Sequence, residues 1–202
     1  NIDYKKYGLE NALIIDNSGA WRDEKGLSEH LKSKGVSKVL LTAPTKAPLK
    51  NIVYGVNESD LNNTDKIVGA ASCTTNAIVP LLKALDEDYG INNGHVETIH
   101  SYTNDQNLID NYHSKSRRGR SAALNMVITE TGAASAVSQI LPNLKGKLTA
   151  NAIRVPTRLS VLALPPKFVC FSSTVTSYSK ALSLQAIASP PKPEPITIAF
   201  FI

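Results

Sequence analysis

Two residues able to support nucleophilic chemistry stand at the ends of predicted secondary-structure elements. Cys73 follows the apolar run 67–69 and precedes an apolar-periodic stretch, which places it between a strand and a helix N-terminus. Free backbone N–H groups and the positive end of the helix dipole favour a thiolate there. His100 follows the alternating run 95–99, which predicts a strand. An imidazole beside a thiol is the arrangement that cysteine nucleophiles use.

Each residue also has an ordinary structural interpretation. Cys73 taken alone could be a buried inert thiol, and His100 a hydrogen-bonded core histidine. A Cys-His hydrolase would use the same pair, but that function leaves the arginines of segment 117–120 without a role. Hydrolysis of an ester without a cofactor would favour this alternative.

Composition indicates an ordinary globular chain with a small-molecule partner. The net charge of +5 comes with a cluster of basic residues at 115–120, and 42% of the residues are hydrophobic. A single basic loop suffices for a phosphorylated small molecule, whereas a nucleic-acid partner is not predicted because no aromatic residues are interleaved with the charges.

The sequence predicts neither a membrane segment nor a metal centre. No apolar run is long enough to span a bilayer, and the first residues contain no signal-peptide core, so we expect a cytoplasmic location. With two cysteines, Cys73 and Cys170, a disulfide framework is not expected. The four histidines have no metal-ligand spacing.

Hydrophobic periodicity predicts an α/β fold, the second half of a parallel sheet. Strands are expected at 12–15, 39–41, 51–56, 67–68 and 95–99, and helices at 23–34, from after residue 70 to before Gly90, and at 133–141. Pro80 should kink the second helix unless that helix starts late.

Six strings give the chain a family resemblance. They are 72–76 (Ser-Cys-Thr-Thr-Asn), 100–106, 117–123, 129–134, 144–148 and 154–157. In this order and near this spacing they closely resemble the signatures of phosphorylating glyceraldehyde-3-phosphate dehydrogenase. The resemblance covers about residues 1–157, and segments 11–17, 21–23 and 38–44 resemble the longer bacterial variety of that enzyme.

The resemblance implies three regions. Residues 1–72 would be the C-terminal part of a Rossmann-like dinucleotide-binding domain, and 73–157 the N-terminal part of an α+β catalytic domain. Since no Gly-x-Gly-x-x-Gly occurs, we expect a fragment with little dehydrogenase activity. Residues 158–202 are expected to be a divergent, non-homologous tail, either a frameshift product or a lineage-specific extension.

Family roles are carried over by motif. Cys73 would add to an aldehyde and form a thiohemiacetal that becomes a thioester after hydride loss, with His100 as the base. Inorganic phosphate would then release an acyl phosphate. The residues implied in binding the substrate and the attacking phosphate are Ser72, Thr74, Thr103, Arg118, Thr131, Gly132 and Arg154.

The implied cofactor is NAD, with NADP open because the ribose-binding acid is absent and loop 110–113 lacks the usual Leu-Pro. Thr42 and Asn17 would lie near the cofactor. The implied partners are a small phosphorylated aldehyde and inorganic phosphate, and the intact family member would be a homotetramer. An erythrose-4-phosphate dehydrogenase of the same family, or an inactive fragment retaining a reactive thiol, are the alternatives.

Overall fold

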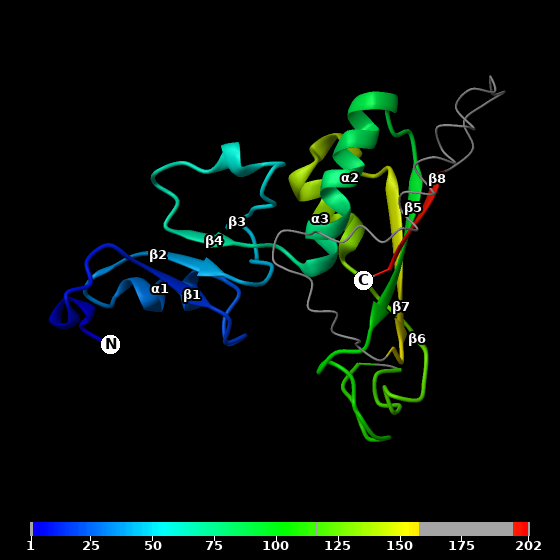
Figure 1. The fold of residues 1–202 in the computed structure, drawn as a ribbon, viewed down its shortest axis with the longest axis horizontal. Helices are drawn as coiled ribbons and strands as arrows, with labels where there is room; N and C mark the ends of the chain where they lie inside the picture. Colours follow the sequence, from blue (N-terminus) through cyan, green and yellow to red (C-terminus); the bar gives the residue numbers. More distant parts are fainter. Residues whose placement is uncertain (1, 116, 158–195, 202) are drawn as a thin grey trace.

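The computed structural model describes residues 2–115, 117–157 and 196–201, the last of these as backbone only. Figure 1 shows two sheets, with helices α2 and α3 beside the second. In chain order the elements are η1 (Tyr4–Tyr7), β1 (Ala12–Asp16), α1 (Glu24–Leu31), β2 (Val36–Leu41), β3 (Lys50–Asn51), η2 (Glu58–Asp60), β4 (Ile67–Gly69), α2 (Cys73–Tyr89), β5 (Gly94–Ser101), β6 (Val127–Thr129), α3 (Ala133–Ile140), η3 (Pro142–Leu144), β7 (Leu148–Val155) and β8 (Ile196–Phe201).

The first sheet is entirely parallel, with strand order β1-β2-β4-β3. Helix α1 is capped by Asp23, whose carboxylate accepts a hydrogen bond of 2.9 Å from the Gly26 N–H. Its residue Leu27 packs with Val39, Leu41 and Ile67 in a buried cluster. The expected α/β fold with a parallel sheet is therefore confirmed.

Strand register brings three chain segments together at the carboxyl edge of this sheet. The Thr42 N–H donates to the Asp16 carbonyl at 3.0 Å, and the Ala70 N–H donates to the Leu41 carbonyl at 2.8 Å. Residues 17, 42 and 70 consequently leave the sheet side by side. Ligands of open α/β sheets bind along such an edge.

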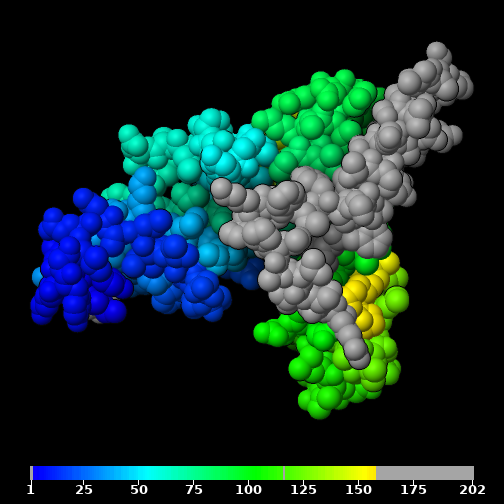
Figure 2. Space-filling view, in the orientation of Figure 1, coloured from blue at the N-terminus to red at the C-terminus, as the bar shows by residue number. Residues whose placement is uncertain are grey.

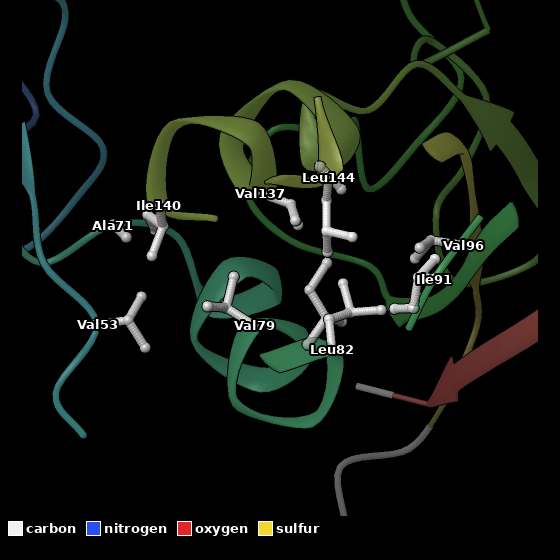
Figure 3. Packing of buried hydrophobic residues seen from close by; sticks show 11 residues of the cluster. Val53, Ala71, Val79, Leu82, Ile91, Val96, Val137, Ile140 and Leu144 are labelled. Carbon is white, nitrogen blue, oxygen red and sulfur yellow. The ribbon is translucent and has the colours of Figure 1, made fainter. Parts of the chain in front are cut away.

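The second sheet is mixed, with strand order β6-β7-β5-β8. Strand β5 pairs in parallel with β7 and β8, and β6 pairs antiparallel with β7. Apolar side chains from α2, α3 and β5, with contributions from segments at residues 53 and 71, form one buried cluster; Figure 3 labels Val53, Ala71, Val79, Leu82, Ile91, Val96, Val137, Ile140 and Leu144. This cluster fixes the position of α2 against β5.

The loop between β5 and β6 carries exposed apolar side chains. Figure 2 shows this loop, in green at the lower right, well away from the blue N-terminal sheet. Tyr112 is 88% exposed and Leu124 is 82% exposed, and Leu108, Ile109 and Met126 are exposed as well. Groups of exposed apolar residues are typical of association surfaces.

Some expected elements differ from the structure. The predicted strand 51–56 is wrong beyond Asn51, because the Asn57 carboxamide accepts a hydrogen bond of 2.8 Å from the Val53 N–H and the chain turns there. Helix α1 ends at Leu31 rather than at residue 34. Strands β6, β7 and β8 were not expected. The prediction that residues 158–202 are a divergent tail falls on residues that the structure does not describe, apart from the backbone of 196–201.

Candidate active site

The turn between β4 and α2 sets the position of Cys73. Ala71 has a φ of 58°, a left-handed conformation that non-glycine residues rarely adopt. The Asn76 carboxamide donates to the carbonyls of Ala70, at 2.7 Å, and Ser72, at 2.9 Å. By holding the carbonyls on both sides of Ala71, Asn76 fixes the sharp turn that leads into the helix. Ala71 and Asn76 were not among the residues predicted for the site.

Cys73 is the first residue of α2 and is exposed. The Ser72 hydroxyl caps the helix by accepting a hydrogen bond of 3.0 Å from the Thr75 N–H. Helix N-terminal N–H groups and the helix dipole attract negative charge at this position. Ser72 therefore acts in the structure as the helix cap, and Thr74 lies in the first turn of the same helix.

His100 faces Cys73 across the boundary between the second sheet and α2. Its Nε2 lies 3.5 Å from Cys73 Sγ, and its Nδ1 lies 2.7 Å from the Ser101 carbonyl oxygen. Because a carbonyl only accepts hydrogen bonds, Nδ1 must carry the proton in the neutral ring. The lone pair of Nε2 then points at the thiol, as a base toward that thiol requires.

The environment of His100 keeps its ring neutral. Burial lowers the pKa of His100 from its usual value of 6.5, the hydrogen bond to Ser101 opposes this, and the charge of Arg154 lowers the pKa further. At about pH 7 the imidazole is therefore free to take a proton.

Arg154 is the third member of this group. It is the register partner of His100 in the β5–β7 pair, and its Nη1 donates to the Ser101 carbonyl at 3.2 Å. Burial and the charge of Arg118 lower the pKa of Arg154, while the charge of Cys73 raises it. A guanidinium stays protonated despite such shifts, so Arg154 supplies a fixed positive charge.

Arg118 is a second basic residue of the site, and it contacts Asp105, which was not predicted as a site residue. Its Nε and Nη2 donate to Thr129 Oγ1 at 3.2 and 2.8 Å, and it forms an ion pair with Asp105. Asp105 lies within the string 100–106, but only the structure shows that its carboxylate reaches Arg118. The charge of Arg118 also contributes, after burial, to lowering the pKa of Arg154.

Other predicted anion ligands lie in loops. The Thr131 hydroxyl accepts a hydrogen bond of 3.2 Å from the Ala133 N–H, and Gly132 is the N-cap of α3. Thr103 is exposed, and its carbonyl accepts from the Gln106 N–H. In the described part of the chain, no hydrogen bond joins Thr103 or Thr131 to the Cys73–His100 pair. Their predicted roles remain predictions.

The predicted cofactor residues lie at the carboxyl edge of the first sheet. Asn17 and Thr42 are exposed, and Thr42 Oγ1 donates to the Asp16 carbonyl at 3.3 Å. This edge runs through Ala70 directly to Cys73. The donors and the edge fit one end of an extended ligand such as a dinucleotide, although the sequence contains no glycine-rich phosphate turn.

Asp16 anchors this edge and was also not predicted. Its side chain is buried, and its carboxylate accepts from the Ser18 hydroxyl and N–H at 2.7 and 2.8 Å and pairs with His30 at 3.0 Å. The Ser18 hydroxyl, followed by His30, holds the pKa of Asp16 below its usual value. Asp16 thereby fixes the loop that carries Asn17.

The described residues form neither a membrane-spanning helix nor a metal-binding cluster. None of the described helices is long and apolar enough to cross a membrane. Likewise, no group of three His, Cys, Asp or Glu side chains in this part of the chain could hold a metal ion.

Comparison with known proteins agrees with the resemblance seen in the sequence. A profile of the C-terminal domain of glyceraldehyde 3-phosphate dehydrogenase matches residues 72–167. The chain is 68% identical over 157 residues to a glyceraldehyde-3-phosphate dehydrogenase-like protein of Pseudomonas aeruginosa (strain UCBPP-PA14), covering 78% of this chain and 34% of that protein.

Other relatives carry the same family name. The identity is 46% over 160 residues to glyceraldehyde-3-phosphate dehydrogenase of Borreliella burgdorferi, covering 77% of this chain and 47% of that protein. It is 47% over 157 residues to the chloroplastic glyceraldehyde-3-phosphate dehydrogenase A of Zea mays, covering 78% and 38%. The chain thus spans about a third to a half of the length of these curated relatives.

Proposed function

Since the chain belongs to the glyceraldehyde-3-phosphate dehydrogenase family, we propose that its site binds an aldehyde phosphate through Cys73 and serves its oxidation to an acyl phosphate. The observation that carries this proposal is the 3.5 Å approach of His100 Nε2 to Cys73 Sγ at the N-terminus of α2. A thiol, a neutral base and a helix N-terminus together make a cysteine nucleophile.

The residues of the chain account for the addition step. His100 Nε2 takes the proton from Cys73 Sγ, and the sulfur forms a bond with the aldehyde carbon as the C=O π electrons move to oxygen. His100 then returns the proton to that oxygen, which gives a neutral thiohemiacetal. The hydrogen bond from Nδ1 to Ser101 keeps the ring oriented through both transfers.

A nicotinamide cofactor is assigned to the carboxyl edge of the first sheet, where Thr42 and Asn17 would hold it. The chemistry expected of that group is acceptance of the hydride from the thiohemiacetal carbon. NAD is proposed, with NADP as the alternative. The proximity of this edge to Cys73, through residues 70–72, supports the assignment.

Two anions would be held by the basic groups and by loop donors. We assign the phosphate of the substrate to Arg118 and Thr103, and the attacking phosphate to Thr74, Thr131 and Gly132, with Arg154 between them. The charges of Arg118 and Arg154 support this assignment, since guanidinium groups bind phosphate in a bidentate manner. In this scheme Ser72 contributes by capping the helix that presents Cys73.

The proposal also covers the location, the oligomeric state, the subtype and the substrate of the protein. We propose a cytoplasmic location and a homotetramer, the latter supported by the exposed apolar side chains of the loop between β5 and β6. We propose that the chain belongs to the longer bacterial variety of the enzyme. Its 68% identical relative is the longer protein, because 157 aligned residues make up 34% of it, whereas 160 aligned residues make up 47% of the 46% identical relative. The substrate is proposed to be a triose phosphate, and the alternative is a tetrose phosphate.

The test measures protection of Cys73 from alkylation by iodoacetamide, with peptide mapping to separate it from Cys170. Glyceraldehyde 3-phosphate should slow alkylation at concentrations where glyceraldehyde without phosphate does little. Equal effects of the two aldehydes would contradict the proposal. Erythrose 4-phosphate in the same assay distinguishes the tetrose alternative, and stoichiometric binding of NAD distinguishes an enzyme from an inactive protein with a reactive thiol.

A further inference from the structure

The side chain of Arg118 is already engaged by an anion of the protein itself. Its Nε and Nη2 point at Thr129 Oγ1, which leaves Nη1 as the side of the guanidinium that Asp105 occupies. The Arg118 side chain is only 12% exposed, whereas that of Asp105 is 48% exposed. A phosphate that binds Nη1 must therefore displace the Asp105 carboxylate or share this nitrogen with it.

The ion pair between Asp105 and Arg118 lies in a region of positive charge. Burial and the charge of Arg118 lower the pKa of Arg154, because like charges repel each other. The Asp105 carboxylate offsets part of this repulsion. A bound phosphate dianion would offset it without Asp105, and its charge would be repelled by the Asp105 carboxylate.

We propose that Asp105 is an internal counter-ion that competes with the phosphate group of the ligand for Arg118. It stabilises the site without ligand and weakens the binding of phosphate, so that the bound anion is released more readily. Asp105 acts through Arg118 and is a positioning residue rather than a catalytic one. This inference rests on the proposed role of Arg118 in binding the substrate phosphate.

Titration of the full 202-residue chain with inorganic phosphate tests this proposal. Binding is followed by calorimetry and by protection of Cys73 from iodoacetamide. Asp105→Asn should bind phosphate about three- to tenfold more tightly than the wild type, because a competing charge is lost. Asp105→Glu should restore wild-type affinity. A merely structural role for Asp105 would not produce a gain in affinity that Glu reverses.

A matched control lies in the same loop. Asp110 forms an ion pair of 3.1 Å with Arg120, and both side chains are exposed. Asp110→Asn should leave phosphate affinity unchanged, while Arg118→Ala should remove the phosphate effect. If Asp105→Asn does not fold, Asp105→Ser makes the same comparison with a smaller polar side chain.

The outcomes separate this inference from the proposed function. Suppose that the wild type binds phosphate in a manner that depends on Arg118. Unchanged or weaker phosphate binding by Asp105→Asn would then overturn only the role of Asp105. Absence of Arg118-dependent binding in both proteins would overturn this role together with the proposed anion site. Tighter binding by Asp110→Asn to the same degree would also overturn it, since the effect would then be one of net charge.

Discussion

His100 and Arg154 occupy paired positions on β5 and β7, and both side chains donate to one carbonyl oxygen, that of Ser101. This shared acceptor orients the imidazole and the guanidinium toward the same region. The charge of Arg154 also lowers the pKa of His100, which adds to the effect of burial. The arrangement keeps a neutral base beside Cys73 and a fixed cation next to that base.

Replacing His100 by asparagine should slow the alkylation of Cys73 by about tenfold or more near pH 7, because the thiol loses its base. The difference in alkylation rate between the variant and the wild type should persist below pH 6.5, because the pKa of His100 is lowered from that value. It should vanish once the pH falls below the lowered pKa, because the ring is then protonated and no longer a base. The measurement is the iodoacetamide rate against pH. His95→Asn, on the same strand with a bond to Thr149, is the control and should have no effect. Equal rates for both variants would refute the role of His100.

Asn76→Asp should distort the turn that carries Cys73. The variant replaces an NH₂ group that donates to two carbonyls by an oxygen that repels them, at a cost of about 1–3 kcal/mol in unfolding free energy. Alkylation of Cys73 should slow as well. Asn107→Asp is the matched control, because Asn107 also donates to two carbonyls but lies in the loop after β5. Urea denaturation and labelling rates measure both effects, and a rate loss of the same size in the control would rule out a specific role for Asn76.

Arg154→Lys should weaken phosphate binding by about tenfold while keeping the charge. Lysine lacks the planar fork that binds phosphate in a bidentate manner, and its ammonium group has a different reach. The measured quantity is the phosphate concentration that halves the alkylation rate of Cys73. Arg120→Lys, at an exposed ion pair, should leave that concentration unchanged. An unaltered concentration in Arg154→Lys would show that Arg154 does not contact the anion.

Asp16→Asn should change the acid stability of the chain. The pKa of Asp16 is lowered in the folded protein, so its contribution to stability is present above about pH 4 and is lost as the pH falls through the lowered pKa. The variant should be less stable than wild type by about 1–3 kcal/mol at neutral pH, and this gap should narrow in acid. Unfolding followed at several pH values measures the gap. Asp110→Asn, at an exposed ion pair, should show a much smaller gap, and equal gaps would contradict the role assigned to the contacts of Asp16 with Ser18 and His30.

The sequence by itself predicted the elements that flank Cys73 and His100 and the chemistry expected of these two residues. The strand before Cys73, the helix after it and the strand leading to His100 follow from hydrophobic periodicity, which depends on residues close together in the chain. The end of α2 before Gly90 was predicted in the same way and is confirmed. The family followed from six ordered strings, since residue types and spacing are properties of sequence alone.

Only the tertiary structure decided which side chains meet. The contacts of Arg118 with Asp105, of Asp16 with His30, and of Arg154 with Ser101 join residues whose spacing carries no periodic signal. Strand β7 was missed although residues 148–152 alternate between apolar and polar types, because two of the three inward residues are alanines, which favour strands weakly; pairing with β5 and β6 stabilises the strand instead. Contacts between distant segments depend on strand register and on packing of the core, and these are set by the whole fold rather than by any one segment.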